Sequence, residues 1–364
     1  MSDLDVIDPL DLAARLMEIE STSGREEAVV DWMHGFLAGR EWSVQRIPVS
    51  PGRDDVLATP AGELARIPRV TLSTHLDTVP PFIPPRIDGD ALRGRGACDA
   101  KGIAAAMICA AERLRERDVA VGLLFVVGEE TAHDGAHAAN EFARTLFGDA
   151  PFDSRILING EPTESTLAVG TKGAMRAVVR VTGQAAHSAY PHLGRSATRE
   201  LVKLLTELDA LELPSDPLLG ETTVNIGSLA GGVADNVLAP SAEARLMIRL
   251  VGPADEVWRL IEQCIGDRAS VEQGPTVQAV RLGVLPGFPT SVAAYATDIP
   301  ELSNWGRPHL FGPGSIHTAH RDDEHVKIAE LREAVSAYER LAIAGLRGVG
   351  FAGSALGGVR RGRR

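Results

Sequence analysis

Three short apolar runs, each followed within three residues by a histidine or a glutamate, constrain the fold of this chain more than any other feature. They are RVTLS at 69–73, VGLLFVV at 121–127 and RILI at 155–158, and stretches of helical character at 101–117 and 137–147 separate them. Strands this apolar are buried on both faces, as happens when helices cover both sides of a parallel sheet. The sequence therefore predicts an α/β domain with a mostly parallel sheet.

A different pattern occupies the middle of the chain. Segments with strand or helix character follow in the order strand, helix, strand, strand, helix, strand, at residues 174–183, 196–211, 222–231, 242–251, 254–265 and 270–280. This βαββαβ order is that of a small ferredoxin-like α+β unit.

After this unit the first pattern returns. The stretch GVLPGFPTS leads to an apolar segment at 306–311 and to a predicted C-terminal helix at 327–346. We therefore expect residues 1–171 and 285–364 to form one α/β domain, into which a smaller domain of residues 172–284 is inserted.

The composition argues against several classes of protein. Of 364 residues, 44% are hydrophobic and 24% charged, which suits a large core and neither a disordered nor a fibrous chain. A net charge of −12 opposes nonspecific nucleic-acid binding, because no positive surplus displaces counterions from phosphates.

Localisation is predicted from the apolar runs and the cysteines. The longest apolar run has about half of the roughly 20 residues that a bilayer crossing needs, and the acidic start MSDLDVIDPLDL does not resemble a signal peptide. Three scattered cysteines fit a reducing compartment. We expect a cytoplasmic protein with neither membrane nor nucleic acid as a partner.

Residue types that commonly bind metals follow the apolar runs. RVTLST leads into His75, GLLFVV into Glu129 and Glu130, and RILING into Glu161. Each alone could be an ordinary polar residue after a buried strand. The carboxyl ends of parallel strands, however, meet at one edge of a sheet, where α/β proteins bind ligands. This convergence favours a metal site.

Two aspartates extend the candidate site. Extended backbone places residues i and i+2 on the same side, so Asp77 can reach the ring nitrogen of His75 that does not bind metal. Asp99 lies in GRGACDAKG, just before the helix predicted from Lys101. It can cap that helix or bridge two cations, and the sequence leaves both roles open.

The remaining candidates are a pair of glutamates and a pair of histidines. Successive side chains of an extended chain diverge, so one of Glu129 and Glu130 can bind a metal while the other acts on a bound water. One further nitrogen ligand is expected from GPGSIHTAHRDDEHV, which contains His317 and His320. We predict that the charge run after His320 is solvated.

Other features have less demanding interpretations. His133 and His137 lack the H-E-x-x-H arrangement and are predicted to be surface histidines. Cys98 has no His or Asn pattern that would mark a nucleophile, and is interpreted as a small filler. A G-x-G-x-x-G nucleotide loop would need a glycine in place of Asp99 and a strand leading into it, so a nucleotide-binding protein is the weaker alternative.

Taken together, these segments resemble the M20 family of dinuclear zinc peptidases and deacylases. The matching motifs are, in order, STHLDTVP, GRGACDAKG, GEE, NGEPTES, GTKGAMRAVVRVTGQAAHSAYPHLG and GPGSIHTAHRDDE. The resemblance extends over residues 8–346. It implies a zinc-hydrolase domain with an inserted dimerisation (lid) domain, two divalent metal ions and a homodimer.

The resemblance also implies a metal ligand set. His75, Asp99 and Glu161 would bind one zinc ion, and Asp99, Glu130 and His320 the other. Nitrogen and carboxylate ligands without thiolates suit Zn²⁺ and also Co²⁺ or Mn²⁺.

The catalytic and substrate-binding residues are implied in the same way. Glu129 would be the general base, with Asp77 beside His75, and His187 would reach into the partner subunit's active site. Asn236, Arg249 and Gly314 would bind polar groups of the substrate. Ala100 follows the bridging aspartate where the family often has Asp or Met, and His317 is an additional histidine.

Within the family the chain most resembles acetylornithine deacetylase, through GPGSIHTAH and the upstream ATDIPEL. The expected reaction is hydrolysis of the amide of an N-acyl amino acid, N-acetylornithine or a near relative, as in arginine biosynthesis. The alternatives are a succinyl-diaminopimelate desuccinylase, a dipeptidase or a carboxypeptidase on the same scaffold, and a metal-binding relative without activity.

Overall fold

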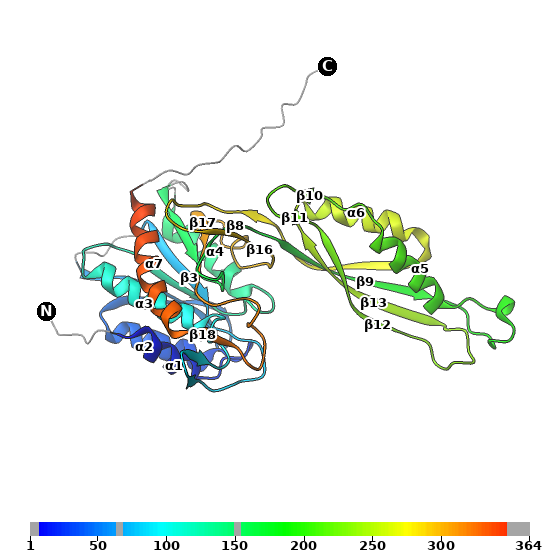
Figure 1. Cartoon of the computed structure of the whole chain (residues 1–364), viewed down its shortest axis with the longest axis horizontal. Coiled ribbons are helices and arrows are strands. Elements are labelled where there is room, and N and C mark those ends of the chain that lie inside the picture. Colours follow the sequence, from blue (N-terminus) through cyan, green and yellow to red (C-terminus); the bar gives the residue numbers. More distant parts are fainter. Residues whose placement is uncertain (1–6, 63–67, 149–153, 348–364) are drawn as a thin grey trace, which may run out of the picture. The chain divides into compact units, whose positions relative to one another are not determined.

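The computed structural model describes residues 7–62, 68–148 and 154–347, which form two compact units (Figure 1). The first unit draws on the segments Met1–Val169, Leu282–Ser291 and Glu301–Arg364, and the second on Gly170–Arg281 and Val292–Pro300.

A six-stranded sheet forms the centre of the first unit. Its order is β1-β2-β6-β3-β7-β17, with β1 Trp42–Ser50, β2 Arg53–Pro60, β6 Gly122–Val126, β3 Val70–His75, β7 Ile156–Asn159 and β17 Arg307–Leu310. Strands β6, β3, β7 and β17 are parallel, whereas β2 is antiparallel to both of its neighbours. The three apolar runs are thus the central strands β3, β6 and β7.

Helices cover both faces of this sheet. One face packs in a common core with α1 Pro9–Met17, α2 Glu27–Gly39, α3 Lys101–Arg115 and α7 Ile328–Leu346. The other face packs against α4 Asp134–Phe147 and the indole of Trp305. Every residue of β3, β6 and β7 is buried, because both faces of the sheet are covered. Strand β6 is accordingly apolar throughout, whereas β3 also buries the polar side chains of Thr71, Ser73 and Thr74.

The described residues also form two small three-stranded sheets. Strands β4 Arg86–Asp88, β5 Ala91–Arg93 and β18 His325–Lys327 form one, in the order β18-β5-β4. Strands β8 Leu167–Thr171, β15 Val280–Arg281 and β16 Thr290–Ala293 form the other, in the order β15-β8-β16, where the chain passes from one unit to the other.

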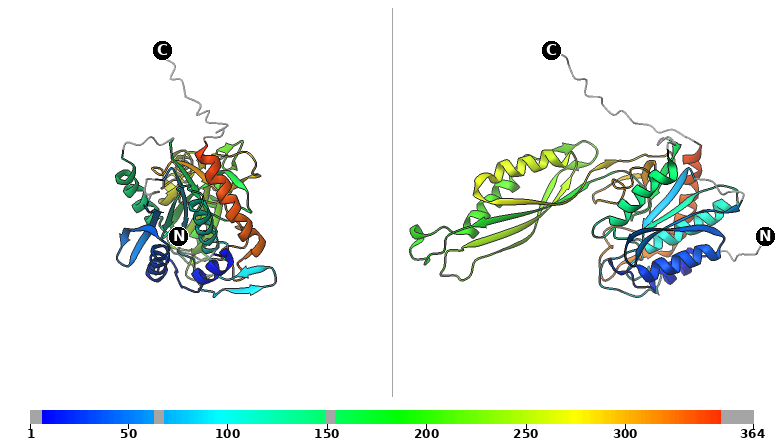
Figure 2. Two further views of the ribbon diagram at one scale, coloured as in Figure 1. Left: turned by 90° about the vertical axis from the view of Figure 1, so that its left-hand side faces the viewer. Right: turned by 180° about the vertical axis from the view of Figure 1, so that it is seen from behind.

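The second unit is a four-stranded antiparallel sheet with its helices on one face (Figures 1 and 2). Its elements are β9 Gly173–Thr182, α5 Ala197–Asp209, β12 Thr223–Gly231, β13 Ser241–Leu250, α6 Ala254–Ile265 and β14 Ser270–Val277, in the sheet order β12-β13-β9-β14. A short hairpin, β10 Ser215–Asp216 and β11 Gly220–Glu221, and two 3₁₀ turns, Pro191–Leu193 and Gly266–Arg268, lie outside this sheet. Buried and less buried residues alternate along β9 and β13, since only one face is covered.

The predicted class, a mostly parallel α/β domain carrying a ferredoxin-like α+β unit, is confirmed. The agreement follows from local patterns: continuous burial in the parallel strands, and period-two alternation in the antiparallel ones. Among the described residues, no helix is both long and apolar enough to cross a lipid bilayer.

Gly102, in the first turn of α3, generates a stability prediction. A Cβ atom at this position would lie 2.2 Å from the backbone oxygen of Ala97, so we expect Gly102→Ala to lower the free energy of unfolding by about 1–3 kcal/mol, as overpacking does. Gly35 in α2 is the matched control, since a Cβ there meets nothing within 4 Å. Gly35→Ala should be stabilising by about 0.5–1 kcal/mol through helix propensity. Thermal unfolding of both variants measures the difference, and equal shifts would contradict the close contact.

Candidate metal centre and active site

The carboxylate of Asp99 joins two histidines that are far apart in the sequence. Its Oδ1 lies 3.0 Å from Nε2 of His75, and its Oδ2 lies 3.2 Å from Nε2 of His320. Asp99 precedes α3, whose N-cap residue is Ala100 and which has no side-chain cap hydrogen bond. The Asp99 carboxylate therefore does not cap the helix and lies between the two histidines.

His75 is held in place at the end of β3. Its ring is 1% exposed, and Nδ1 lies 2.9 Å from the backbone oxygen and 3.6 Å from Oδ1 of Asp77. In the metal-free protein, Nε2 carries a proton that it donates to Oδ1 of Asp99 at 3.0 Å. A proton on Nδ1 satisfies the contact with Asp77, so a ring that loses the Nε2 proton presents the lone pair of that nitrogen on the same side. This is the orientation in which a neutral histidine binds a metal ion.

Asp77 also fixes the turn that carries the two glutamates. Its carboxylate accepts the backbone N–H of Glu129 at 3.1 Å and of Glu130 at 3.2 Å. Glu130 then reaches His320, with Oε1 2.9 Å from Nε2. The structure thus brings His75, Asp99, Glu130 and His320 into one cluster, with Asp77 behind it.

Glu161 and Glu129 add negative charge to this cluster. Glu161 follows β7 and is 4% exposed. Burial lowers the pKa of His75, but hydrogen bonds with Asp77 and Asp99, together with the charges of Glu161 and Glu129, raise it well above its ordinary value. Five carboxylates therefore surround two imidazole rings: Asp77, Asp99, Glu129, Glu130 and Glu161. So much buried negative charge is unfavourable unless cations neutralise it, and these oxygen and nitrogen donors suit divalent metal ions.

The proton affinities of the cluster reflect this excess. Hydrogen bonds to Asp99 and Glu130 raise the pKa of His320 to about 10. Burial raises the pKa of Asp99, but hydrogen bonds with His320 and His75 outweigh it and lower that pKa below its ordinary value. Protonated histidines thus offset part of the negative charge of the cluster.

A predicted catalytic residue, His187, and a predicted substrate-binding residue, Asn236, lie together in the second unit. His187 pairs with Val237 in an isolated β-bridge, and Ser188 N–H donates to the backbone oxygen of Asn236 at 2.9 Å. The N–H of Ala189 donates to Nδ1 of His187 at 3.2 Å. This bond makes Nδ1 an acceptor, so the proton of the neutral ring is on Nε2.

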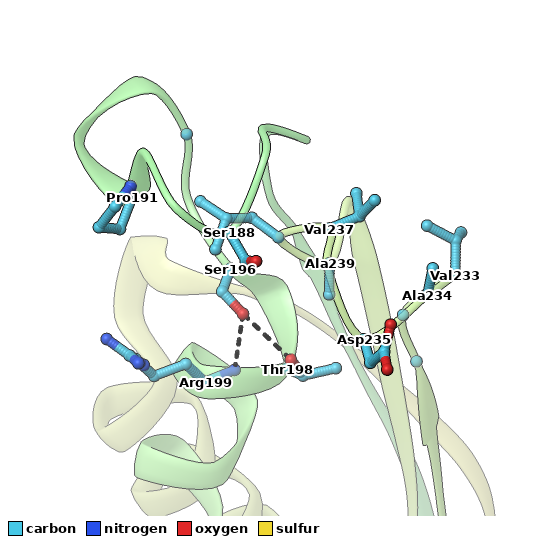
Figure 3. Close-up of a pocket in the computed structure, with 14 residues that line it drawn as sticks. Ser188, Pro191, Ser196, Thr198, Arg199, Val233, Ala234, Asp235, Val237 and Ala239 are labelled. Atoms are coloured by element: carbon cyan, nitrogen blue, oxygen red, sulfur yellow. Dashed lines mark hydrogen bonds between the residues drawn. The ribbon is translucent and has the colours of Figure 1, made fainter.

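A hollow of about 840 Å³ adjoins these loops (Figure 3). Ser188, Asp235 and the first turn of α5 line it, and there Ser196 Oγ accepts the N–H of Arg199. Asp235 is the only His, Cys, Asp or Glu residue in its described lining. The hollow therefore lacks the donors of a metal centre.

Arg249 is not close to His187 within the second unit. It pairs with Ala174 near the start of β9, whereas Ser241 at the other end of β13 pairs with Thr182 near the end of β9. Arg249 lies on the sheet face that α5 and α6 leave open, half-buried, and burial and the neighbouring charge of Arg176 lower its pKa.

Gly314 and Cys98 pack against each other in the first unit. Gly314 has φ +79°, and a Cβ there would lie 2.5 Å from that of Cys98, so only glycine fits. The thiol of Cys98 is buried, which raises its pKa well above the ordinary value, as expected for a filler and not for a nucleophile.

His137 is exposed and lies 3.3 Å from Glu301, in keeping with its interpretation as a surface histidine.

One prediction about this region is wrong, and two residues were missed. The charge run after His320 is not solvated throughout, because the side chain of Glu324 is fully buried. Period-two alternation into β18, with Glu324 on the same side as the buried Val326, is the signal that could have shown it. Ser23, which donates to Asp77 Oδ2 at 2.7 Å, and Arg95, which pairs with Glu324, carried no signal in the sequence.

Residues 71–344 match the model of peptidase family M20/M25/M40. A protein of Aspergillus terreus named "Probable carboxypeptidase" is 38% identical over 366 residues, covering 90% of this chain and 84% of that protein.

Two solved structures show the same fold at low sequence identity. An M20 family metallo-carboxypeptidase of Sulfolobus solfataricus has a TM-score of 0.73 at 17% identity, covering 94% of this chain and 100% of that one. A dinuclear metal binding peptidase of the M20 family from Bacillus subtilis has a TM-score of 0.67 at 15% identity, covering 93% and 98%.

The raised pKa of His320 predicts how the metal-free protein responds to pH. A group whose pKa is higher in the folded than in the unfolded state stabilises the fold at low pH. Here the contribution is complete below about pH 6.5, the unfolded value, and is lost as the pH rises toward about 10. After chelation, the melting temperature should therefore fall across this window, and His320→Asn should reduce the fall. His317→Asn, in the same loop, is the control and should leave it unchanged; an identical fall in all three proteins would contradict the assignment.

Proposed function

Because this chain belongs to the peptidase family M20/M25/M40, whose members are metal-dependent hydrolases, we propose that it hydrolyses the amide bond of an amino acid whose α-carboxylate is free. An N-acyl amino acid such as N-acetylornithine contains this bond, and so does a peptide cleaved at its C-terminal residue. The proposal is carried chiefly by the cluster in which Asp99 lies between His75 and His320, backed by Glu130.

The donor set supports two divalent metal ions. His75, Asp99 and Glu161 would hold one ion, and Asp99, Glu130 and His320 the other. Imidazole and carboxylate donors suit Zn²⁺, and also Co²⁺ or Mn²⁺. When bound, such ions supply Lewis acidity, which acidifies water and polarises a carbonyl oxygen.

The chain's own residues would move the proton and orient the ligands. Glu129 lies in the turn that Asp77 fixes through two backbone N–H groups. Its carboxylate would accept the proton of the attacking water and then give it to the departing amine. Asp77 would keep the His75 ring in the tautomer that leaves Nε2 free.

We propose that Arg249 binds the free carboxylate of the substrate. Its guanidinium is half-buried on the open face of the second unit's sheet, where Arg176 adds a second positive charge. A guanidinium fork matches a carboxylate in two contacts. Asn236 and Gly314 would bind other polar groups of the substrate, as expected from the sequence motifs.

His187 would stabilise the oxyanion, from the partner subunit of a homodimer. The tautomer imposed by the Ala189 N–H leaves Nε2 as a hydrogen-bond donor, which is what an oxyanion requires. The His187 ring lies in an exposed loop of the second unit, where it is accessible to a second copy of the chain.

The carboxypeptidase reaction is the second candidate, and the names of the relatives favour it. The Aspergillus terreus protein is named "Probable carboxypeptidase" and the Sulfolobus solfataricus structure is called a metallo-carboxypeptidase. The metal centre would be the same for both reactions. Its residues therefore do not indicate whether the group removed from the amino acid is an acetyl or an aminoacyl group.

A substrate panel tests the proposal. We expect the metal-loaded protein to hydrolyse N-acetylornithine, other N-acetyl amino acids or N-blocked dipeptides, and to act at least about tenfold more slowly on the same compounds with the carboxylate capped as an amide. Arg249→Lys should lose most of this preference, while Arg245→Lys, exposed on the same strand, should keep it. Equal rates for free and capped compounds in the wild-type protein would reject carboxylate recognition.

Replacing the base tests the catalytic role of Glu129. Glu129→Gln keeps the shape of the side chain but cannot accept a proton, so kcat should fall by roughly 10² to 10⁴. Elemental analysis should still find two metal ions per chain. The opposite result, activity retained with an ion lost, would make Glu129 a ligand and Glu130 the base.

A further inference from the structure

Glu324 is a buried carboxylate that the proposed reaction does not use. Its Oε1 accepts the backbone N–H groups of Gly96 at 3.0 Å, Cys98 at 3.2 Å and Asp99 at 3.3 Å. Its Oε2 accepts from Arg95 Nη1 at 2.6 Å. Donors thus occupy both oxygens, so Glu324 is not placed to bind a metal ion itself.

Arg95 makes the corresponding contacts in the other direction, from the loop of residues 94–99 to the loop that contains Glu324. Its side chain is 2% exposed, and Nη1 also donates to the backbone oxygen of Arg321 at 3.3 Å. Gly94 N–H donates to the backbone oxygen of Glu324 at 3.0 Å. Side chain and backbone therefore link the loop of residues 94–99 to the loop of residues 315–324.

A short sheet fixes how these loops meet. Strand β18 pairs with β5 in the register His325↔Arg93 and Val326↔Leu92, and both Val326 and Leu92 are buried. Glu324 directly precedes β18, and Gly94 directly follows β5. The register of this ladder thus places the carboxylate beneath the loop that carries Asp99.

Each of these loops carries one ligand of the metal centre. Asp99 ends the first loop, and His320 precedes Glu324 by four residues in the second. The two side chains meet at 3.2 Å, between Oδ2 of Asp99 and Nε2 of His320. Whatever holds the loops in register also sets this separation.

We propose that the buried Glu324–Arg95 pair positions Asp99 and His320 relative to each other, and thereby sets the affinity of the metal position that these two ligands share. The inference rests on the metal centre proposed above. The position formed by Asp99, Glu130 and His320 takes two of its three ligands from the linked loops. The position formed with His75 and Glu161 takes only Asp99 from them, so loss of the pair weakens the first position more.

Metal titration of Glu324→Gln tests this inference. Glutamine has the same shape, but its NH₂ group cannot accept a hydrogen bond. This NH₂ group would therefore face either the backbone N–H groups that Oε1 now accepts or the guanidinium of Arg95. Chelated protein is titrated with Zn²⁺ by calorimetry. We expect the Kd of one ion to rise by about 10- to 100-fold, as it does when groups that orient ligands are removed, with the Kd of the other ion within about threefold of the wild-type value.

Asp323→Asn is the matched control for this experiment. Asp323 is the adjacent carboxylate and is exposed, with Oδ1 2.8 Å from Arg321 Nε. Its substitution removes the same charge from the same loop, and both ions should bind as in the wild-type protein. Unchanged affinities in Glu324→Gln, or equal losses for both ions, would overturn the positioning role. Absence of metal binding in the wild-type protein would instead overturn the proposed function.

Hydrogen exchange provides a readout that does not depend on metal. In the metal-free protein, the amides of Gly96, Cys98 and Asp99 should exchange at least about tenfold faster in Glu324→Asp than in the wild type, because the shorter side chain withdraws from them. Glu324→Asp retains the charge and is the variant to use if Glu324→Gln does not fold. Wild-type exchange rates at these three amides would contradict the inference.

Discussion

The carboxylate of Asp99, shared between His75 and His320, is the interaction on which the rest of the first unit depends. It joins the end of a central strand, the start of α3 and a loop more than two hundred residues further along the chain. Placing a carboxylate there is unfavourable by itself, since Glu130 and Glu161 bring more negative charge to the same buried region. The arrangement is favourable only with positive charge at its centre, supplied by protons in the metal-free protein and by metal ions in the proposed function.

Hydrogen-bond donors held in fixed positions around the cluster partly offset the negative charge of its carboxylates. Asp77 accepts hydrogen bonds from Ser23 and from the N–H groups of both glutamates. Glu324 is satisfied by three backbone N–H groups and Arg95. Lys101 is 1% exposed and donates to the backbone oxygen of Ile19 at 2.6 Å, although burial lowers its pKa to about 7. Donors fixed in this way need little reorganisation when charge changes at the centre, which is a general requirement of a pre-organised site.

The second unit has a different design. Its open sheet face presents Arg249 and Arg176, and its exposed loops present His187 beside Asn236. These are groups that recognise anions and polar atoms, and the ligand cluster lies entirely in the first unit. In the proposed function, the first unit would supply the chemistry and the second would select the substrate.

The sequence by itself determined the elements and the candidate ligands. Period-two alternation in β9 and β13 and the short, largely apolar runs around β3, β6 and β7 are local properties of the chain. The apolar runs predicted His75, the two glutamates and Glu161 at one sheet edge. Tertiary structure alone decided what Asp99 contacts, because a residue before a helix can equally cap it or turn away. It also decided that Glu324 is buried and that Ser23 reaches Asp77, 54 residues away. Such contacts depend on how distant segments pack, and hydrophobic periodicity reports only which face of an element is covered, not which polar group it meets there.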